Sequence, residues 1–139
     1  MTETIPQAAP SETGIAVVTG ATGAIGSATA SRLVADGWRV ALVARDRDRV
    51  QALTTHLGPR TAPFVADATS ASAVDAAFTE VVKHLGPPSA LVHAVGSTLL
   101  RPSHAIADSD FADVIATNLG SAFYALRAFV RAVPRGTPA

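Results

Sequence analysis

The sequence contains no cysteine, which excludes disulfides, thiolate metal ligands and a cysteine nucleophile. Its four histidines do not have the spacing of a zinc-binding helix, and we expect no metal site. No apolar run is long enough to span a bilayer, and residues 1–14 lack the basic and apolar regions of a secretory signal. These absences predict a cytoplasmic protein without a membrane partner.

Charge of one sign is not in excess either, since Lys plus Arg and Asp plus Glu each number 11. No overall field favours nucleic acid as a partner, so an anion site would have to be local. Hydrophobic residues make up 48% of the chain and charged residues 16%, as in a packed globular body. We expect one domain at residues 15–133, a disordered lead-in at residues 1–14 and a flexible tail at residues 134–139.

Four short apolar runs are predicted to be strands, at residues 15–19, 40–44, 62–66 and 90–95. None alternates apolar with polar residues, which is typical of a parallel sheet covered on both faces. Helices are predicted at residues 24–36, 46–57, 72–85 and 108–133. The first three end at a glycine, twice with proline after it, which is a helix-stop signal. Ser72 and Asp75 resemble a capping box, and Asp46 and Asp108 are predicted N-caps.

The alternation of strands and helices predicts an α/β fold. We expect a Rossmann-type, doubly wound parallel sheet in a three-layer αβα arrangement, and right-handed crossovers give it the strand order 3-2-1-4. The predicted helix at residues 108–133 carries more apolar residues than one sheet face can cover. This helix is therefore expected to have a second partner.

A glycine-rich segment, residues 19–26, directly follows the first predicted strand and leads into the first predicted helix. Small residues let the chain turn tightly there, so backbone N–H groups at the positive helix end can approach a pyrophosphate. Such turns also serve only to pack a helix against a strand, but the repeating strand–helix pattern favours nucleotide binding. The predicted cofactor-binding residues of this turn are Gly20, Thr22, Gly23, Ile25 and Gly26.

The end of the second predicted strand indicates which dinucleotide would bind. An acidic residue there would accept the ribose 2′-hydroxyl of NAD, but the sequence has Ala44 followed by Arg45. Arg45 can bind a 2′-phosphate through charge-assisted hydrogen bonds, which predicts NADP rather than NAD. The alternative is that Arg45, Arg47 and Arg49 only form a solvated helix start. The missing acidic residue also argues against a methyltransferase built on a similar sheet.

Several further segments show that the chain resembles the short-chain dehydrogenases/reductases. Residues 65–69 are similar to the family's third-strand segment, and the resemblance implies that Asp67, with Ala68 beside it, holds the adenine amino group. Residues 117–120 are similar to the segment that bears the family's helical asparagine. The resemblance implies that Asn118 is the one catalytic residue in the chain, which bends the last helix and helps to seat a proton-relay water.

The fourth predicted strand carries another part of this resemblance. Residues 86–96 are similar to the family segment that lines the cofactor ribose and usually ends Asn-Asn-Ala-Gly. Ala94 and Gly96 match this segment and are predicted to bind the cofactor, whereas His93 and Val95 depart from it. His93 could serve as a general base, but a histidine that closes a buried strand is more often a hydrogen-bonded structural side chain.

The resemblance implies hydride transfer between a nicotinamide and a carbonyl or alcohol carbon, with a tyrosine, a lysine and a serine as catalytic residues. In the family these follow a fifth strand, and here the single tyrosine, Tyr124, is followed four residues later by Ala128. We therefore expect a Rossmann domain truncated after its fourth helix, which forms the cofactor-binding half of an NADP-dependent oxidoreductase.

Such a half is expected to be inactive alone and, when completed, to take a small carbonyl or alcohol substrate. The alternative is a non-catalytic nucleotide-binding module or a partner subunit. Without a neighbouring strand the fourth strand leaves an apolar sheet edge, and the last helix is only half covered. Both features predict self-association.

Overall fold

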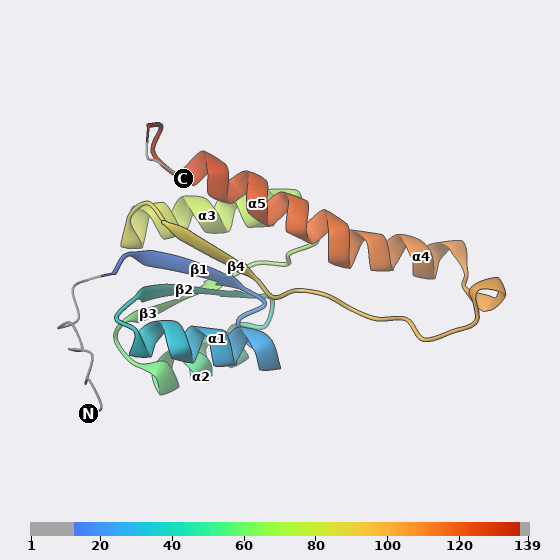
Figure 1. Ribbon diagram of the computed structural model, residues 1–139, viewed down its shortest axis with the longest axis horizontal. Helices are drawn as coiled ribbons and strands as arrows, with labels where there is room; N and C mark the ends of the chain where they lie inside the picture. The colour runs from blue at the N-terminus through green and yellow to red at the C-terminus, as the bar shows by residue number, and fades with distance from the viewer. Residues whose placement is uncertain (1–12, 137–139) are drawn as a thin grey trace, which may run out of the picture.

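The computed structural model describes residues 13–136, so the predictions for residues 1–12 and 137–139 lie outside the described residues. Its centre is a parallel sheet in the order β3-β2-β1-β4, which confirms the predicted fold and strand order (Figure 1). The strands are β1 (Ile15–Thr19), β2 (Arg39–Ala44), β3 (Thr61–Val65) and β4 (Ala90–His93). The predicted fourth strand was two residues too long, because β4 ends at His93, which pairs with the last residue of β1, Thr19.

Helices cover both faces of this sheet, with α1 and α2 on one side and α3 and α5 on the other (Figure 1). The helices are α1 (Ala24–Ala35), α2 (Arg47–Leu57), α3 (Ala71–Leu85), α4 (Asp108–Ile115) and α5 (Ser121–Ala132). A short 3-10 turn, η1 (Ser103–Ala105), precedes α4, and a π-helical segment, η2 (Ala116–Gly120), joins α4 to α5. No helix within residues 13–136 is both long and apolar enough to cross a membrane.

The two central strands, β1 and β2, are apolar except for Thr19 at the end of β1 and Arg39 at the start of β2, because each face of the sheet is covered. Consecutive side chains of a strand point to opposite faces. Val17 packs in the cluster that contains α3 and α5, and the next residue, Val18, packs in the cluster under α1 and α2. Both valines are fully buried. Burial of one such side chain contributes roughly 1.5–3 kcal/mol, which favours this continuous apolar pattern over alternation.

The two edges of the sheet differ in their backbone chemistry. β3 contains Pro63, which has no N–H to donate. The N–H of Ala66, three residues on, donates to the carbonyl oxygen of Ala44 in β2 at 3.0 Å. Because N–H groups alternate sides along a strand, the Pro63 nitrogen lies on the outer side of β3. β4, at the other edge, has the sequence Ala-Leu-Val-His and contains no proline.

The starts of α2 and α3 test two of the predicted caps. Asp46 caps α2, since its Oδ1 accepts a backbone N–H of the first turn at 3.0 Å, as predicted. The predicted capping box at Ser72 is wrong, because Ser70 is the N-cap of α3 and accepts the N–H of Ala73 at 3.3 Å. The reason is a tight turn just before this helix. The N–H of Ser70 donates to the carbonyl oxygen of Asp67 at 3.0 Å, so the N-cap lies two residues before Ser72 and the helix begins at Ala71.

The last predicted helix is interrupted rather than uniform, since the π-helical η2 separates α4 from α5. The predicted N-cap Asp108 is wrong as well. Asp108 is the first residue of α4, and the N-cap position is held by Ala107, which makes no side-chain capping bond. In the first turn of α4, the negative charge of the Asp108 carboxylate stabilises the helix by its interaction with the positive helix end. The predicted helix-stop residues Gly58 and Gly86 have φ angles of 88° and 104°, which confirms them.

Candidate functional site

A groove of about 590 Å³ lies where the strands of the sheet end. Strand order reverses between β1 and β4, and the chain leaves these two neighbouring strands toward opposite faces, which opens a crevice at this edge. The residues that line the groove are Thr19, Gly20, Thr22, Gly23, Val43, Ala44, Arg45, Arg49, Ala66, Asp67, Ala68, Thr69, Ala94, Val95, Gly96, Ser97, Asp113, Ala116 and Thr117.

Most of the predicted site residues line this groove, and three do not. Those that line it are Gly20, Thr22, Gly23, Arg45, Asp67, Ala68, Ala94 and Gly96. Ile25 lies in the first turn of α1 and is 75% exposed. Gly26 is buried one residue further along α1, and Asn118 follows the groove residue Thr117 in η2.

The glycine-rich turn brings β1, α1 and the end of β4 closer together than side chains would permit. Gly20 has a φ angle of 70°, and a Cβ there would collide with the carbonyl oxygen of Ala94. A Cβ at Gly26 would collide with the carbonyl oxygen of Gly20. Gly23, at the N-cap of α1, makes no side-chain capping bond. The N–H groups of the first turn of α1 are therefore available to an anion at the positive helix end.

Arg45 and Arg49 bring two cationic side chains to the part of the groove beside β2. Arg45 directly follows β2 and is exposed. Arg49, in the first turn of α2, donates from Nη2 to the carbonyl oxygen of Thr22 at 3.0 Å. No binding role was predicted for Arg49. The available signal was its place in the first turn of a helix that begins just after β2. The interpretation as a solvated helix start fits Arg47, which is exposed and outside the groove lining.

Asp67 follows β3, and Thr69 fixes its carboxylate. The backbone N–H and the hydroxyl of Thr69 donate to Asp67 Oδ1 at 2.9 and 2.7 Å. These bonds, together with the nearby charge of Arg45, lower the pKa of Asp67 below its ordinary value, so the carboxylate is ionised at neutral pH. Within residues 13–136 both bonds end on Oδ1, which leaves Oδ2 available to a donor outside the chain.

Asn118 binds the backbone of the loop that follows β4. Its Nδ2 donates to the carbonyl oxygens of Ser97 at 3.0 Å and Val114 at 2.9 Å, and its Oδ1 accepts the Ser97 N–H at 3.1 Å. A Cβ at Gly96 would lie 2.8 Å from Asn118 Oδ1, so this loop also approaches η2 closely. Asn118 thus holds the groove residues Gly96 and Ser97 in place. Ser97 was missed from the sequence, because its partner lies 21 residues away in the chain.

His93 makes hydrogen bonds with both of its ring nitrogens and does not line the groove. Nδ1 lies 2.7 Å from Thr19 Oγ1, and Nε2 lies 3.0 Å from Ser121 Oγ. The ring is half-buried, and this burial lowers the pKa of His93, so the ring is neutral at pH 7. These contacts favour the structural role over a general base.

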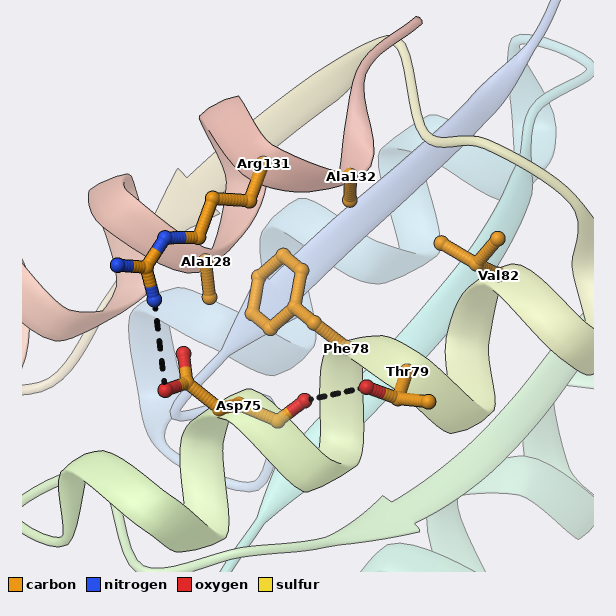
Figure 2. Close-up of a pocket in the computed structure, with 7 residues that line it drawn as sticks. All are labelled: Asp75, Phe78, Thr79, Val82, Ala128, Arg131 and Ala132. Atoms are coloured by element: carbon orange, nitrogen blue, oxygen red, sulfur yellow. Dashed lines mark hydrogen bonds and ion pairs between the residues drawn. The ribbon is translucent and has the colours of Figure 1, made fainter.

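A second hollow, of about 440 Å³, lies between α3 and α5 in the outer helix layer, away from the strand ends. Figure 2 shows Asp75 of α3 reaching across to Arg131 of α5, with the ring of Phe78 between the two helices. The Asp75–Arg131 ion pair measures 3.7 Å, and Asp75 also lies 3.9 Å from Arg127. This hollow is a helix-packing feature, and the arrangement gives Asp75 a role other than the predicted capping box.

The chain matches the family model described as short chain dehydrogenase over residues 14–138. It is 30% identical over 119 residues to the 3-oxoacyl-(acyl-carrier-protein) reductase FabG of Escherichia coli (strain K12), covering 86% of this chain and 49% of that protein. It is 36% identical over 126 residues to galactitol 2-dehydrogenase (L-tagatose-forming) of Cereibacter sphaeroides, covering 89% and 49%. The chain therefore spans about half the length of the curated relatives it matches.

Solved structures show the same similarity. A variant of actinorhodin polyketide ketoreductase with NADPH superposes with a TM-score of 0.82 at 30% identity, covering 86% of this chain and 47% of that one. A short-chain dehydrogenase/reductase from Serratia marcescens superposes with a TM-score of 0.84 at 29% identity, covering 92% and 54%. Both structures therefore match the described fold over most of this chain and about half of their own length.

Proposed function

The chain belongs to the short-chain dehydrogenase family, and on this basis we propose that the groove at its strand ends binds NADP(H). One observation carries the proposal. The open N-terminus of α1 and the side chains of Arg45 and Arg49 meet at a single groove, and β2 ends in Ala44 without a carboxylate. A helix N-terminus suits a pyrophosphate, and arginine suits the 2′-phosphate that distinguishes NADP from NAD.

In this proposal the backbone from Gly20 to Gly26 holds the pyrophosphate, with Thr22 beside it and the exposed Ile25 in apolar contact with the cofactor. Asp67 accepts the adenine amino group through Oδ2, since Oδ1 is already occupied by Thr69. The remaining contacts come from backbone and small side chains. Ala68 borders the adenine, and Ala94 and Gly96 border the nicotinamide ribose.

The experiment that tests the proposal is calorimetric titration of the chain with NADPH and with NADH. Because charge-assisted hydrogen bonds to the 2′-phosphate are available only to NADPH, we expect it to bind about tenfold to a hundredfold more tightly. Titration with 2′-phospho-ADP-ribose and ADP-ribose, which lack the nicotinamide, measures the contribution of the 2′-phosphate to the affinity on its own. Equal or tighter binding of NADH would contradict the NADP assignment, and absence of binding by both would contradict the groove assignment.

We further propose that the chain supplies the cofactor-binding part of an NADP-dependent oxidoreductase and does not turn over alone. The bound cofactor would supply or accept a hydride. Tyr124 packs against the core with its ring 5.5 Å from the Arg127 guanidinium. The single lysine, Lys83, pairs with Glu80 at 3.7 Å on α3. Neither residue is among those that line the groove.

The proposed substrate is a small carbonyl or alcohol compound. The relatives named as a 3-oxoacyl reductase, a galactitol dehydrogenase and a polyketide ketoreductase support this class. NADPH oxidation with a panel of ketones is expected to be undetectable for this chain. Tight NADPH binding without turnover would equally fit the second candidate, a non-catalytic nucleotide-binding module. Turnover by the 139-residue chain would contradict both proposals.

We also propose that two copies of the chain associate through the outer face of the last helix. Exposed apolar side chains follow this face at intervals of three or four residues: Phe111, Ile115, Leu119, Phe123, Leu126 and Val130. A continuous apolar stripe of this kind favours burial against another apolar surface. Sedimentation is expected to show a dimer that Leu126→Lys dissociates, whereas Gln51→Lys on α2 does not. A monomeric wild-type chain would contradict this proposal.

A further inference from the structure

A chain of hydrogen bonds behind the groove joins two residues that line different parts of its wall. Thr19 Oγ1 lies 2.7 Å from His93 Nδ1, and His93 Nε2 lies 3.0 Å from Ser121 Oγ. The Ser121 hydroxyl in turn donates to the carbonyl oxygen of Thr117. Thr19 and Thr117 line the groove, whereas His93 and Ser121 lie behind it. His93 therefore connects the end of β1, next to Gly20, with the π-helical η2.

The donors and acceptors fix the tautomer of the ring. The Ser121 hydroxyl has one proton, and this proton is used in the bond to Thr117. Ser121 Oγ must therefore accept from His93, which places the ring proton on Nε2. Nδ1 is then unprotonated and accepts the proton of the Thr19 hydroxyl. Each group in the series therefore donates to the next one, from Thr19 of β1 through His93 and Ser121 to the carbonyl oxygen of Thr117 in η2.

The surroundings keep this ring neutral. Its two hydroxyl partners are buried, with 2% and 0% of their residues' surface exposed, and burial lowers the pKa of His93 from 6.5. The charged or titratable residues on the two helices that flank η2 are Asp108, Asp110 and Asp113 of α4 and Tyr124, Arg127 and Arg131 of α5. None of these forms an ion pair with His93 among residues 13–136. No neighbouring charge therefore offsets the cost of protonating the ring.

We propose that His93 is a positioning residue of the cofactor groove, whose neutral ring holds Thr19 and Thr117 at a fixed separation. The inference rests on the proposed binding of NADP(H). A groove whose walls are fixed in advance loses less conformational freedom when the cofactor binds, so its affinity is higher. Protonation of the ring would place a proton on Nδ1, opposite the proton of Thr19. The Thr19 oxygen would then accept from Nδ1, and the Thr19 hydroxyl would have to turn its own proton away from His93, its only acceptor among the described residues. Because Thr19 is buried, the hydroxyl would lose this bond without replacement, and the Thr19 side of the wall would be held less firmly.

A matched pair of variants tests the hydrogen bond at Thr19. Thr19→Val keeps the shape of the side chain and removes the hydroxyl, and Thr19→Ser keeps the hydroxyl. We expect Thr19→Val and His93→Asn to raise the Kd for NADPH about threefold to tenfold, because a buried acceptor or donor loses its partner. Thr19→Ser should retain more affinity than Thr19→Val. His104→Asn, on the exposed turn η1 outside the groove, is the control and should bind as the wild type does.

The state of the ring is measured independently by 15N NMR of the imidazole in the chain without cofactor. We expect the Nε2–H tautomer for His93 in the wild type. In Ser121→Ala, which removes the acceptor of the Nε2 proton, we expect a mixture of the two neutral tautomers. The Kd for NADPH should rise as the pH falls from 8 toward 5.5, more steeply in the wild type than in His93→Asn. Titration of the cofactor's 2′-phosphate acts on both proteins alike, so the difference in slope belongs to His93.

Three results would overturn the inference. One is an Nδ1–H tautomer at His93, another is equal affinity of Thr19→Val and Thr19→Ser, and the third is the same pH slope with and without the histidine. If a variant fails to fold, the tautomer of His93 in the wild type still decides the matter. A correctly folded wild-type chain that binds no NADPH would instead overturn the proposed function, and the inference would fall with it.

Discussion

The two sides of the groove are built by different means. The glycine wall, residues 19–26, depends on the absence of side chains, since Gly20 and Gly26 allow backbone atoms to lie in contact. The π wall, residues 94–97 with η2, depends on the presence of polar side chains, above all Asn118. A wall built on backbone contact has almost no tolerance for added atoms. A wall built on side-chain hydrogen bonds can lose one bond and remain folded, so it is the part that sequence changes can adjust.

The largest effect is expected from Gly26→Ala, which breaks the glycine wall. The added Cβ would overlap the carbonyl oxygen of Gly20 and also meet Ala21 Cα at 3.0 Å, and these are backbone atoms that cannot rotate away. We expect a loss of about 3 kcal/mol in the free energy of unfolding, with loss of NADPH binding. Urea denaturation measures the change. The control is Gly120→Ala, where the nearest atoms lie 3.8 Å from the new Cβ; an equal loss in both variants would contradict the comparison.

Arg45→Ala is expected to have the next largest effect, on NADPH affinity rather than on stability. The side chain is exposed and its removal leaves no buried cavity, so the melting temperature should stay within the error of the wild type. Loss of the charge-assisted bonds should weaken NADPH about tenfold to a hundredfold and leave NADH unchanged. Calorimetry with both cofactors measures this, with Arg47→Ala as the matched control. A similar loss of NADPH affinity in Arg47→Ala would mean that any positive charge near the groove has this effect and that Arg45 makes no specific contact.

Asn118→Leu is expected to have a smaller effect, because it removes side-chain bonds from the π wall without disturbing the sheet. The Ser97 N–H and carbonyl group lose their partner, but the loop is exposed and water can replace it. We expect about 1 kcal/mol lower stability and NADPH binding about threefold to tenfold weaker. Hydrogen exchange of the Ser97 amide should quicken, whereas Leu119→Ala in the same segment should leave it unchanged. Unaltered exchange in Asn118→Leu would show that the π wall is held by other contacts.

The smallest effect concerns the pH dependence of stability. Burial lowers the pKa of His93, so the unfolded chain binds a proton more readily than the folded chain below pH 6.5. The stabilisation that comes from the neutral His93 ring is therefore fully present above pH 6.5, and it is lost as the pH falls toward and through the pKa of His93 in the folded chain. The pKa of Asp67 is also lowered, but from 3.8, so its contribution is lost in a separate and more acidic range. Urea midpoints at pH 8 and pH 5.5 should differ more for the wild type than for His93→Asn. An identical difference would contradict the shift.

The same contrast between the walls explains what could be predicted from the sequence. The strands and the glycine-rich turn are local patterns, so the fold, the strand order and the position of Gly20 followed from adjacent residues. The π wall depends on pairs separated by 21 and 28 residues, Asn118 with Ser97 and His93 with Ser121. Neither pair has a local signal. Even with the resemblance naming Asn118, its partner could not be identified without the fold.

The misplaced start of α3 has a different cause, because here two local signals compete. Ser72 and Asp75 have the spacing of a capping box, but the turn set by Asp67 and Thr69 already directs the chain into a helix at Ser70. A cap is chosen by the geometry of the preceding residues as well as by its own sequence. Arg49 was missed for the same reason as the pairs of the π wall, because its contact with Thr22 joins residues 27 positions apart.

The proline in β3 makes one edge of the sheet less suited than the other to pair with a further strand. An added strand needs alternating N–H donors from the edge it joins, and Pro63 interrupts that supply on the outer side of β3. β4 offers an uninterrupted ladder and lies next to the β1–β4 boundary where the groove opens. A fifth strand laid parallel to β4 would extend the groove floor on the side of Ala94 and Gly96 and leave the side of Arg45 and Asp67 as it is. Lengthening the sheet would thus enlarge the groove on one side without altering the residues on the other.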